Sequence, residues 1–210
     1  LITEYVGCHT EARPTDSGQK LVRHAMVHAE IVNAVMGHPK IAGAISWCAF
    51  DYASQDWITV DGVQPWGIAD LFRHPKWAAW FYESQIDPQR RPVLRIASRW
   101  RVGDLAGFDP NQALMKYGHD APLVVFSNCD RIDVCVGNKK KGTFEPAREA
   151  FPHLAHPPFL CTGMGRFWGP SWQDLHVTGY LDGRQVAEQV IPATNEAREE
   201  RVSREGNGHE

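Results

Sequence analysis

One acidic and one aromatic residue stand where short β-prone runs end, and these are the positions at which the chain could do chemistry. Glu4 falls at the end of the first run, Leu1–Tyr5, and Trp47 closes the apolar run Ile41–Trp47. A carboxylate at a strand end is usually structural, paired with an arginine for example, and a tryptophan in an apolar run usually belongs to the core. The surrounding sequence therefore has to decide whether these two residues are functional.

Other reactive residue types form no convincing site. His24 and His28 are spaced as neighbours on a helix, but the Glu of the zinc motif H-E-x-x-H is missing, which favours an ordinary helix face. The five cysteines are odd in number and contain no C-x-x-C pair, so we expect reduced thiols in packing positions. The sequence thus predicts no metal and no cofactor.

The first half of the chain must supply the elements that position Glu4 and Trp47. Apolar residues recur at helical spacing over Gln19–Val35, and Gly37 with Pro39 ends that helix. Ile41–Trp47 is too short for a helix and predicts a buried parallel strand. A second amphipathic helix is predicted over Pro75–Gln85. Alternation of strands and helices favours βα units.

The second half shows a different pattern of predicted elements. Short β-prone runs are separated by Gly, Asn, Asp and Pro, which is typical of an antiparallel sandwich. The runs are Val93–Trp100, Leu123–Ser127, Ile132–Val136, Phe159–Cys161 and Leu175–Leu181. Hairpin-turn residues occupy Val136–Lys139 and Leu181–Arg184. With a polar linker at Asp87–Pro92, the predicted domains are 1–87 and 88–194, followed by a charged, disordered tail over 195–210.

Composition excludes several classes of protein. The 210 residues carry a formal charge of −3, so no basic surface for nucleic acid or an anionic membrane is expected. With 43% hydrophobic residues and no apolar run of about 18, the chain reads as soluble and globular. It opens on Leu1 without an initiator Met or a basic leader, so we expect it to begin inside a longer protein. The compartment is left open.

Four segments resemble glycoside hydrolase family two, and within it the β-galactosidase-type enzymes. Ile2–His9 is similar to the nucleophile strand, an apolar strand that ends in Glu-Tyr/Phe-x-Gly. Gly43–Tyr52 resembles the last barrel strand, with its Trp and Asp-Tyr, and Gly67–Lys76 resembles the segment that leads into the last barrel helix. Val124–Asn138 is similar to a hairpin of the immunoglobulin-like domains that follow the barrel.

The resemblance implies a mixed fold, α/β plus all-β: the last two βα units of a (β/α)8 TIM barrel, then an antiparallel immunoglobulin-like β-sandwich. It implies a retaining exo-glycosidase that hydrolyses terminal β-D-galactosides, with Glu4 as nucleophile and Trp47 as an apolar floor beneath the sugar. Tyr5 and His9 would hydrogen-bond the nucleophile or a sugar hydroxyl, although Cys8 here separates the family's Gly-His pair. The full-length enzyme could form a homo-oligomer.

The acid/base carboxylate that such an enzyme needs is missing from this chain. The family carries it on an Asn-Glu motif several strands earlier, and no Asn-Glu precedes Glu4. The chain alone is therefore predicted to be inactive.

Two alternatives stay open. One is a noncatalytic carbohydrate-binding or scaffold module that uses Trp100, Trp168 and Trp172. The other is another family-two activity, β-glucuronidase or β-mannosidase; the Asn-x-Lys clamp of glucuronidases has no counterpart in residues 53–70.

Overall fold

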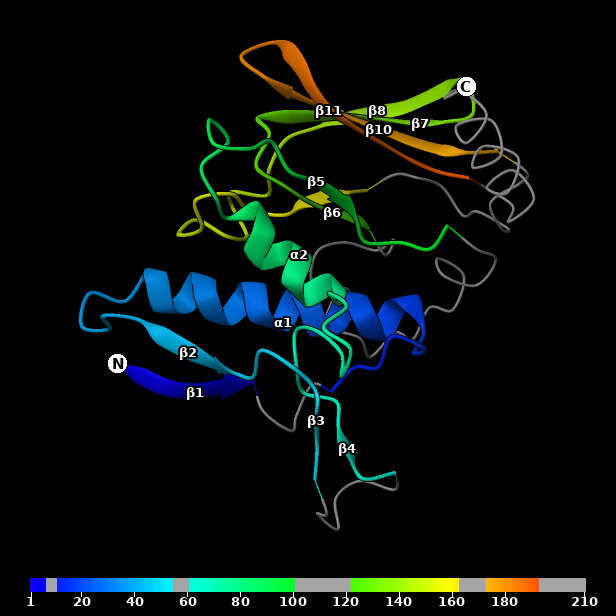
Figure 1. Ribbon diagram of the computed structural model, residues 1–210. Helices are drawn as coiled ribbons and strands as arrows, with labels where there is room; N and C mark the ends of the chain where they lie inside the picture. Colours follow the sequence, from blue (N-terminus) through cyan, green and yellow to red (C-terminus); the bar gives the residue numbers. More distant parts are fainter. Residues whose placement is uncertain (7–10, 55–60, 101–121, 163–172, 193–210) are drawn as a thin grey trace, which may run out of the picture.

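Two parallel strands, each followed by a helix, build the first half of the computed structural model, which describes residues 1–6, 11–54, 61–100, 122–162 and 173–192. The order is β1 (Ile2–Val6), α1 (Gly18–Met36), β2 (Ala44–Trp47) and α2 (Trp77–Ser84) (Figure 1). β1 and β2 pair in parallel, as the predicted βα units require. Between β2 and α2, a short antiparallel pair is formed by β3 (Tyr52–Ala53) and β4 (Val63–Gln64).

Local sequence explains where α1 begins and ends. The Ser17 side chain accepts a hydrogen bond from the Lys20 backbone N–H at 3.3 Å, which satisfies one of the free N–H groups of the first turn. Gly37 follows the last helical residue, where the sequence predicted the end. One face of α1 packs against α2, and Ala25, Met26 and Phe81 are completely buried there.

The second half is a sandwich of two antiparallel sheets. The larger sheet has the order β11-β10-β7-β8 and the smaller one β5-β6-β9. Their strands are β5 (Leu94–Ile96), β6 (Leu123–Ser127), β7 (Arg131–Val136), β8 (Lys139–Phe144), β9 (Phe159–Cys161), β10 (Leu175–Leu181) and β11 (Arg184–Ile191). β8 and β11 were not singled out in the sequence, because their residues are mostly charged or polar and their apolar alternation is weak.

Alternation and turn chemistry set the register of the sandwich. β7 buries Ile132, Val134 and Val136 on one face, as its sequence predicts. The β10–β11 turn places Asp182 at φ 49° and Gly183 at φ 77°. Positive φ at both central residues defines the tight turn that matches the twist of a hairpin.

β6 lies between the two halves of the molecule. Both of its faces are covered, and all five of its residues are buried. Leu123 and Val125 belong to the core between the sheets, whereas Val124 and Phe126 pack against the helices. The Phe126 ring lies 6.1 Å from that of Phe81 on α2. In Figure 1 the smaller sheet accordingly lies between the larger sheet and α2.

The structure corrects one alternative. Trp100 is only 1% exposed and its indole N–H donates to the Gln173 carbonyl at 2.8 Å, so it cannot stack on a glycan. Trp168 and Trp172 lie outside the described residues, as does the predicted tail 195–210. No helix in the described part is long and apolar enough to cross a membrane.

Candidate active site

The two strand ends singled out in the sequence lie side by side. The parallel register aligns Tyr5 with Ser46 and Val6 with Trp47. Glu4, one residue before Tyr5, is therefore carried on the strand next to Trp47, and its side chain is exposed. Because β1 and β2 run in the same direction, the segments that follow both strands leave from the same edge of the sheet.

Neighbouring side chains on each strand point to opposite faces. Tyr5 points toward the helices and contacts His28 of α1 and Tyr82 of α2. Glu4 precedes Tyr5 in the stretch of β1 where the register with β2 shifts, and it is exposed. On β2 the exposed residues are Ile45, 55% exposed, and Trp47, 43% exposed. Among the described residues, Glu4 on β1 and Trp47 on the neighbouring β2 are thus both exposed.

The Trp47 indole is hydrogen-bonded at one edge, and its side chain stays exposed. Its indole N–H donates to the Tyr52 hydroxyl at 3.2 Å, and the two rings meet edge to face with centroids 6.2 Å apart. Trp66 continues the aromatic row beyond Tyr52, with centroids 6.1 Å apart. Sequence reasoning missed Trp66, because no local pattern connects it with the strand. A fixed, exposed indole plane is suited to binding an apolar sugar face.

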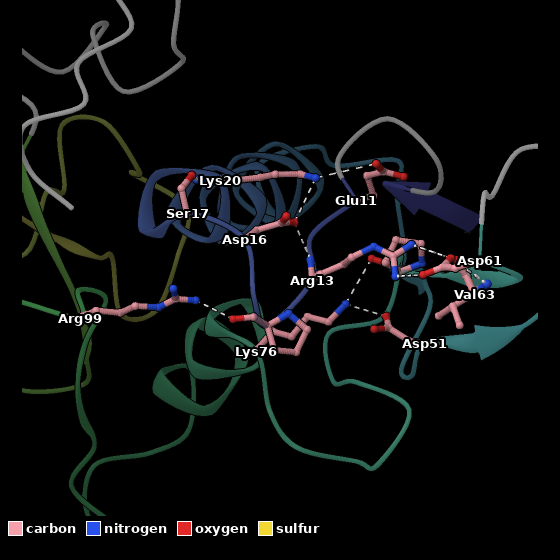
Figure 2. Close-up of polar contacts among 12 residues, drawn as sticks. Glu11, Arg13, Asp16, Ser17, Lys20, Asp51, Asp61, Val63, Lys76 and Arg99 are labelled. Carbon is pink, nitrogen blue, oxygen red and sulfur yellow. Dashed lines mark hydrogen bonds and ion pairs between the residues drawn. The ribbon is translucent and has the colours of Figure 1, made fainter. Parts of the chain in front are cut away.

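A buried ion pair fastens the segment after β2. Lys76 Nζ lies 2.6 Å from Asp51 Oδ1 and also donates to the Pro65 carbonyl at 3.1 Å (Figure 2). The same Asp51 oxygen accepts the Gly67 backbone N–H at 2.8 Å. A Cβ on Gly67 would come within 2.3 Å of the Asp51 backbone nitrogen, so glycine is needed for this approach.

Burial disfavours the charged forms of both Asp51 and Lys76. Desolvation raises the pKa of Asp51, and the nearby ammonium of Lys76 only partly counteracts it. Desolvation likewise lowers the pKa of Lys76, against the attraction of Asp51. No local pattern around Asp51 indicates this partner, which lies 25 residues away.

Arg13 ties the segment after β1 to the same region. Its guanidinium binds Asp61 with two bonds of 2.6 and 2.9 Å, and it also reaches the Val63 carbonyl (Figure 2). Arg13 lowers the pKa of Asp61. The Pro65 carbonyl, besides accepting from Lys76, accepts the Ala12 N–H at 3.2 Å. Segments that follow both strands are therefore bound to each other beside the Glu4–Trp47 edge.

A chain of hydrogen-bonded side chains, two half-buried tyrosines and two buried histidines, lies behind β1. The Tyr5 and Tyr82 hydroxyls are hydrogen-bonded, Tyr82 Oη lies 2.8 Å from His28 Nδ1, and His28 Nε2 lies 3.3 Å from His24 Nε2. Burial lowers the pKa of His28 to about 4 and that of His24 to about 2. Burial also raises the pKa of Tyr82. The two histidines are thus packed inside the molecule, in agreement with the helix-face interpretation.

The remaining predicted site residue, His9, lies outside the described residues. Tyr5, predicted to contact the nucleophile or a sugar hydroxyl, uses its hydroxyl in the bond with Tyr82. Cys48, Cys129, Cys135 and Cys161 are free thiols. Among the described residues no three His, Cys, Asp or Glu side chains converge on a metal position.

Structural comparison defines the class of fold. A putative β-galactosidase from Bacteroides fragilis superposes with a TM-score of 0.65 at 15% identity, over 91% of this chain and 27% of that one. A β-glucuronidase from Parabacteroides merdae gives 0.56 at 15% identity, over 90% of this chain and 24% of that one. At such identities the likeness establishes a shared fold. The chain therefore has the sheet-rich mixed fold found in parts of these glycosidases.

Sequence comparison is more specific. The chain is 33% identical over 197 residues to a β-galactosidase from Thermoanaerobacterium thermosulfurigenes, covering 90% of this chain and 26% of that protein. It is 33% identical over 202 residues to a β-galactosidase from Rhizobium meliloti, covering 92% of this chain and 25% of that protein. No protein-family profile matches the chain. The resemblance to β-galactosidase-type enzymes is confirmed, and the chain spans about a quarter of the length of these relatives.

Proposed function

We propose that the chain is part of a retaining exo-glycosidase that hydrolyses terminal β-D-galactosides. Residues 1–87 are the last two βα units of its (β/α)8 catalytic barrel, residues 88–194 the immunoglobulin-like sandwich that follows, and residues 195–210 a tail. Glu4 is the nucleophile, and the acid/base carboxylate comes from a strand upstream of this chain. Curated relatives named β-galactosidase, similar over nine-tenths of the chain, support this assignment.

The single observation that carries the proposal is the placement of Glu4 and Trp47. Both are exposed and lie on neighbouring parallel strands, near the ends at which the strands leave the sheet. Active sites of (β/α)8 barrels are built at the carboxyl ends of their strands. A noncatalytic module has no need for an exposed carboxylate beside an exposed, hydrogen-bonded indole.

The chemistry follows from the roles of two carboxyl groups. The ionised Glu4 attacks the anomeric carbon while the upstream acid protonates the departing glycosidic oxygen, which leaves a glycosyl ester on Glu4. The upstream residue then acts as a base and activates a water molecule, which hydrolyses the ester with net retention. The Trp47 plane packs against the apolar C–H face of the sugar and orients it for attack.

The substrate is a neutral galactoside rather than a glucuronide. A glucuronide carries a carboxylate that has to be paired on binding. Residues 53–70 contain neither Asn nor Lys that could form the glucuronidase clamp. Lys76, a nearby cation in the sequence, is buried and already bound to Asp51, so it is not available for this purpose.

Anion rescue tests the proposal. In the full-length protein, Glu4→Gln should lower kcat for a nitrophenyl galactoside by orders of magnitude, because the nucleophile is needed in the transition state. Azide should restore part of the turnover of an activated galactoside and give the inverted galactosyl azide. Glu11→Gln is the matched control, since Glu11 forms an exposed ion pair with Lys20, and it should keep normal kcat. Near-normal kcat in Glu4→Gln would remove Glu4 from the mechanism.

A further inference from the structure

The polar chain behind β1 connects the proposed nucleophile strand with both helices. Tyr5 is the residue after Glu4, and its hydroxyl bonds that of Tyr82 on α2. Tyr82 in turn bonds His28 on α1, and His28 bonds His24 one turn earlier. The Tyr82 hydroxyl is therefore the atom at which side chains of β1, α1 and α2 meet.

Both imidazoles of this chain are neutral near pH 7, because burial lowers the pKa of His28 to about 4 and that of His24 to about 2. A neutral imidazole has one N–H donor and one nitrogen acceptor. Two rings that meet through their Nε2 atoms must then divide the roles, with one donating and the other accepting. The direction of this bond fixes the direction of the bond between His28 and Tyr82, because the other nitrogen of the His28 ring takes the remaining role.

His24 Nδ1 decides that direction. It is buried and has no hydrogen-bond partner among the described residues. An unpaired buried N–H is rarer and costlier than an unpaired acceptor, so His24 carries its proton on Nε2. His24 Nε2–H then donates to His28 Nε2, and His28 Nδ1–H donates to the Tyr82 oxygen. The Tyr82 hydroxyl keeps its own proton and a second lone pair for its bond with the Tyr5 hydroxyl, in which either oxygen can donate.

We infer that Tyr82 is a positioning residue for Glu4, which it holds in place through the hydrogen bond to Tyr5. Glu4 and Tyr5 share a peptide bond, so a Tyr5 side chain fixed on the helix side restricts the position of the Glu4 backbone in this irregular stretch of β1. A nucleophile displaced by about 1 Å can lose about 100-fold in rate. Preorganisation of this kind is what a rigid supporting shell provides. This inference rests on the proposed nucleophilic role of Glu4.

The test measures nucleophilic attack itself. A mechanism-based fluorogalactoside should label the full-length wild type at Glu4, with an inactivation rate constant and a binding constant read from the concentration dependence. Tyr82→Phe keeps the ring and removes the hydroxyl, and it should lower the inactivation rate constant by about tenfold or more while the binding constant stays within about twofold.

Ser84→Ala is the matched control, because it also deletes a buried hydroxyl from α2. Ser84 is 0% exposed and bonds only Phe81 and Gln85 among the described residues. It should lose thermal stability to a similar degree but label at the wild-type rate. If Tyr82→Phe does not fold, Tyr5→Phe removes the same bond from the partly exposed strand side and should show the same selective loss in the inactivation rate constant.

The outcomes distinguish the nucleophilic role of Glu4 from the positioning role of Tyr82. Label on a residue other than Glu4 in the wild type would overturn the proposed function. Label on Glu4, with Tyr82→Phe or Tyr5→Phe reacting as fast as Ser84→Ala, would overturn the positioning role alone. A slow Tyr82→Phe beside a fast Ser84→Ala supports both.

Discussion

Breaking the buried ion pair beneath the candidate site should destabilise the chain much more than removing both of its charges. Lys76→Met would leave Asp51, 6% exposed, with the Gly67 N–H as its remaining bond. Removing one partner of a buried pair costs about 3–5 kcal/mol. The Pro65 carbonyl would lose Lys76 but keep the Ala12 N–H, so it adds little. For a chain of this size that corresponds to a Tm about 6–20 °C lower.

A double variant separates charge from packing. In Asp51→Asn/Lys76→Met, the Asn oxygen can still accept the Gly67 N–H, and no buried charge is left without a partner. We expect its free energy of unfolding to lie within about 1 kcal/mol of wild type, because an apolar substitute for a buried pair is often neutral or better. Thermal unfolding followed by circular dichroism measures both variants.

Lys20→Met is the matched control in the same region. Lys20 lies 3.0 Å from Asp16, and its side chain is 41% exposed (Figure 2). Exposed pairs of this kind contribute about 0–1 kcal/mol, so the Tm should barely change. A Lys76→Met variant as stable as Lys20→Met, or a double variant as unstable as Lys76→Met, would refute the reasoning.

The pH dependence has a definite sign. Burial already raises the pKa of Asp51, and removal of Lys76 raises it further. A carboxyl whose folded-state pKa exceeds its unfolded value destabilises the fold as pH rises through the folded-state pKa. The penalty is absent below the unfolded value of about 3.9. The Tm deficit of Lys76→Met should therefore be smaller at pH 4 than at pH 7, and a deficit that grows on acidification would contradict this.

Three further predictions concern the sandwich, the sugar floor and the isolated chain. Val134→Asp should unfold the sandwich, because it buries an unpaired carboxylate at a position that is 0% exposed. Cys135→Asp, on the other face of β7 and opposite Lys140, should be tolerated. Equal melting curves for the two variants would argue against the register of β7. In the full-length protein Trp47→Ala should lower kcat/KM for galactosides by about tenfold or more, since it removes an aromatic plane, and unchanged kinetics would exclude the floor role. The 210-residue chain alone should release no nitrophenol from a nitrophenyl galactoside above a Glu4→Ala control, because the proposed function places the acid/base outside these residues; measurable release would contradict that placement.

Local patterns in the sequence were enough to predict the elements that carry the site. Period-3.6 spacing located α1, and an apolar run too short for a helix located β2. The predicted burial of that strand is wrong, because Ile45 and Trp47 are exposed among the described residues. The alternation of β7 and the turn residues at Asp182 and Gly183 predicted the hairpins. These features depend on neighbours within a few residues, so the local sequence determines them.

Long-range contacts were decided by the tertiary structure alone. The Asp51–Lys76 pair, the Arg13–Asp61 pair and the Tyr5–Tyr82 bond join residues 25, 48 and 77 positions apart. Nothing in the composition of either partner's neighbourhood names the other. Such pairs form because parallel strands and packed helices bring distant backbone segments together, and a buried polar group then has to find a partner there.

Tyr5 shows the same difference between what the local sequence predicts and what the tertiary structure decides. The sequence placed Tyr5 beside Glu4 and so suggested a contact with the nucleophile or a sugar, but the Tyr5 side chain contacts His28 and Tyr82 of the helices. Only the position of α2 shows that the Tyr5 hydroxyl meets Tyr82. Residue types and spacing thus determined the candidate chemistry of Glu4 and Trp47, while the packing of helices on strands decided which side chains support them.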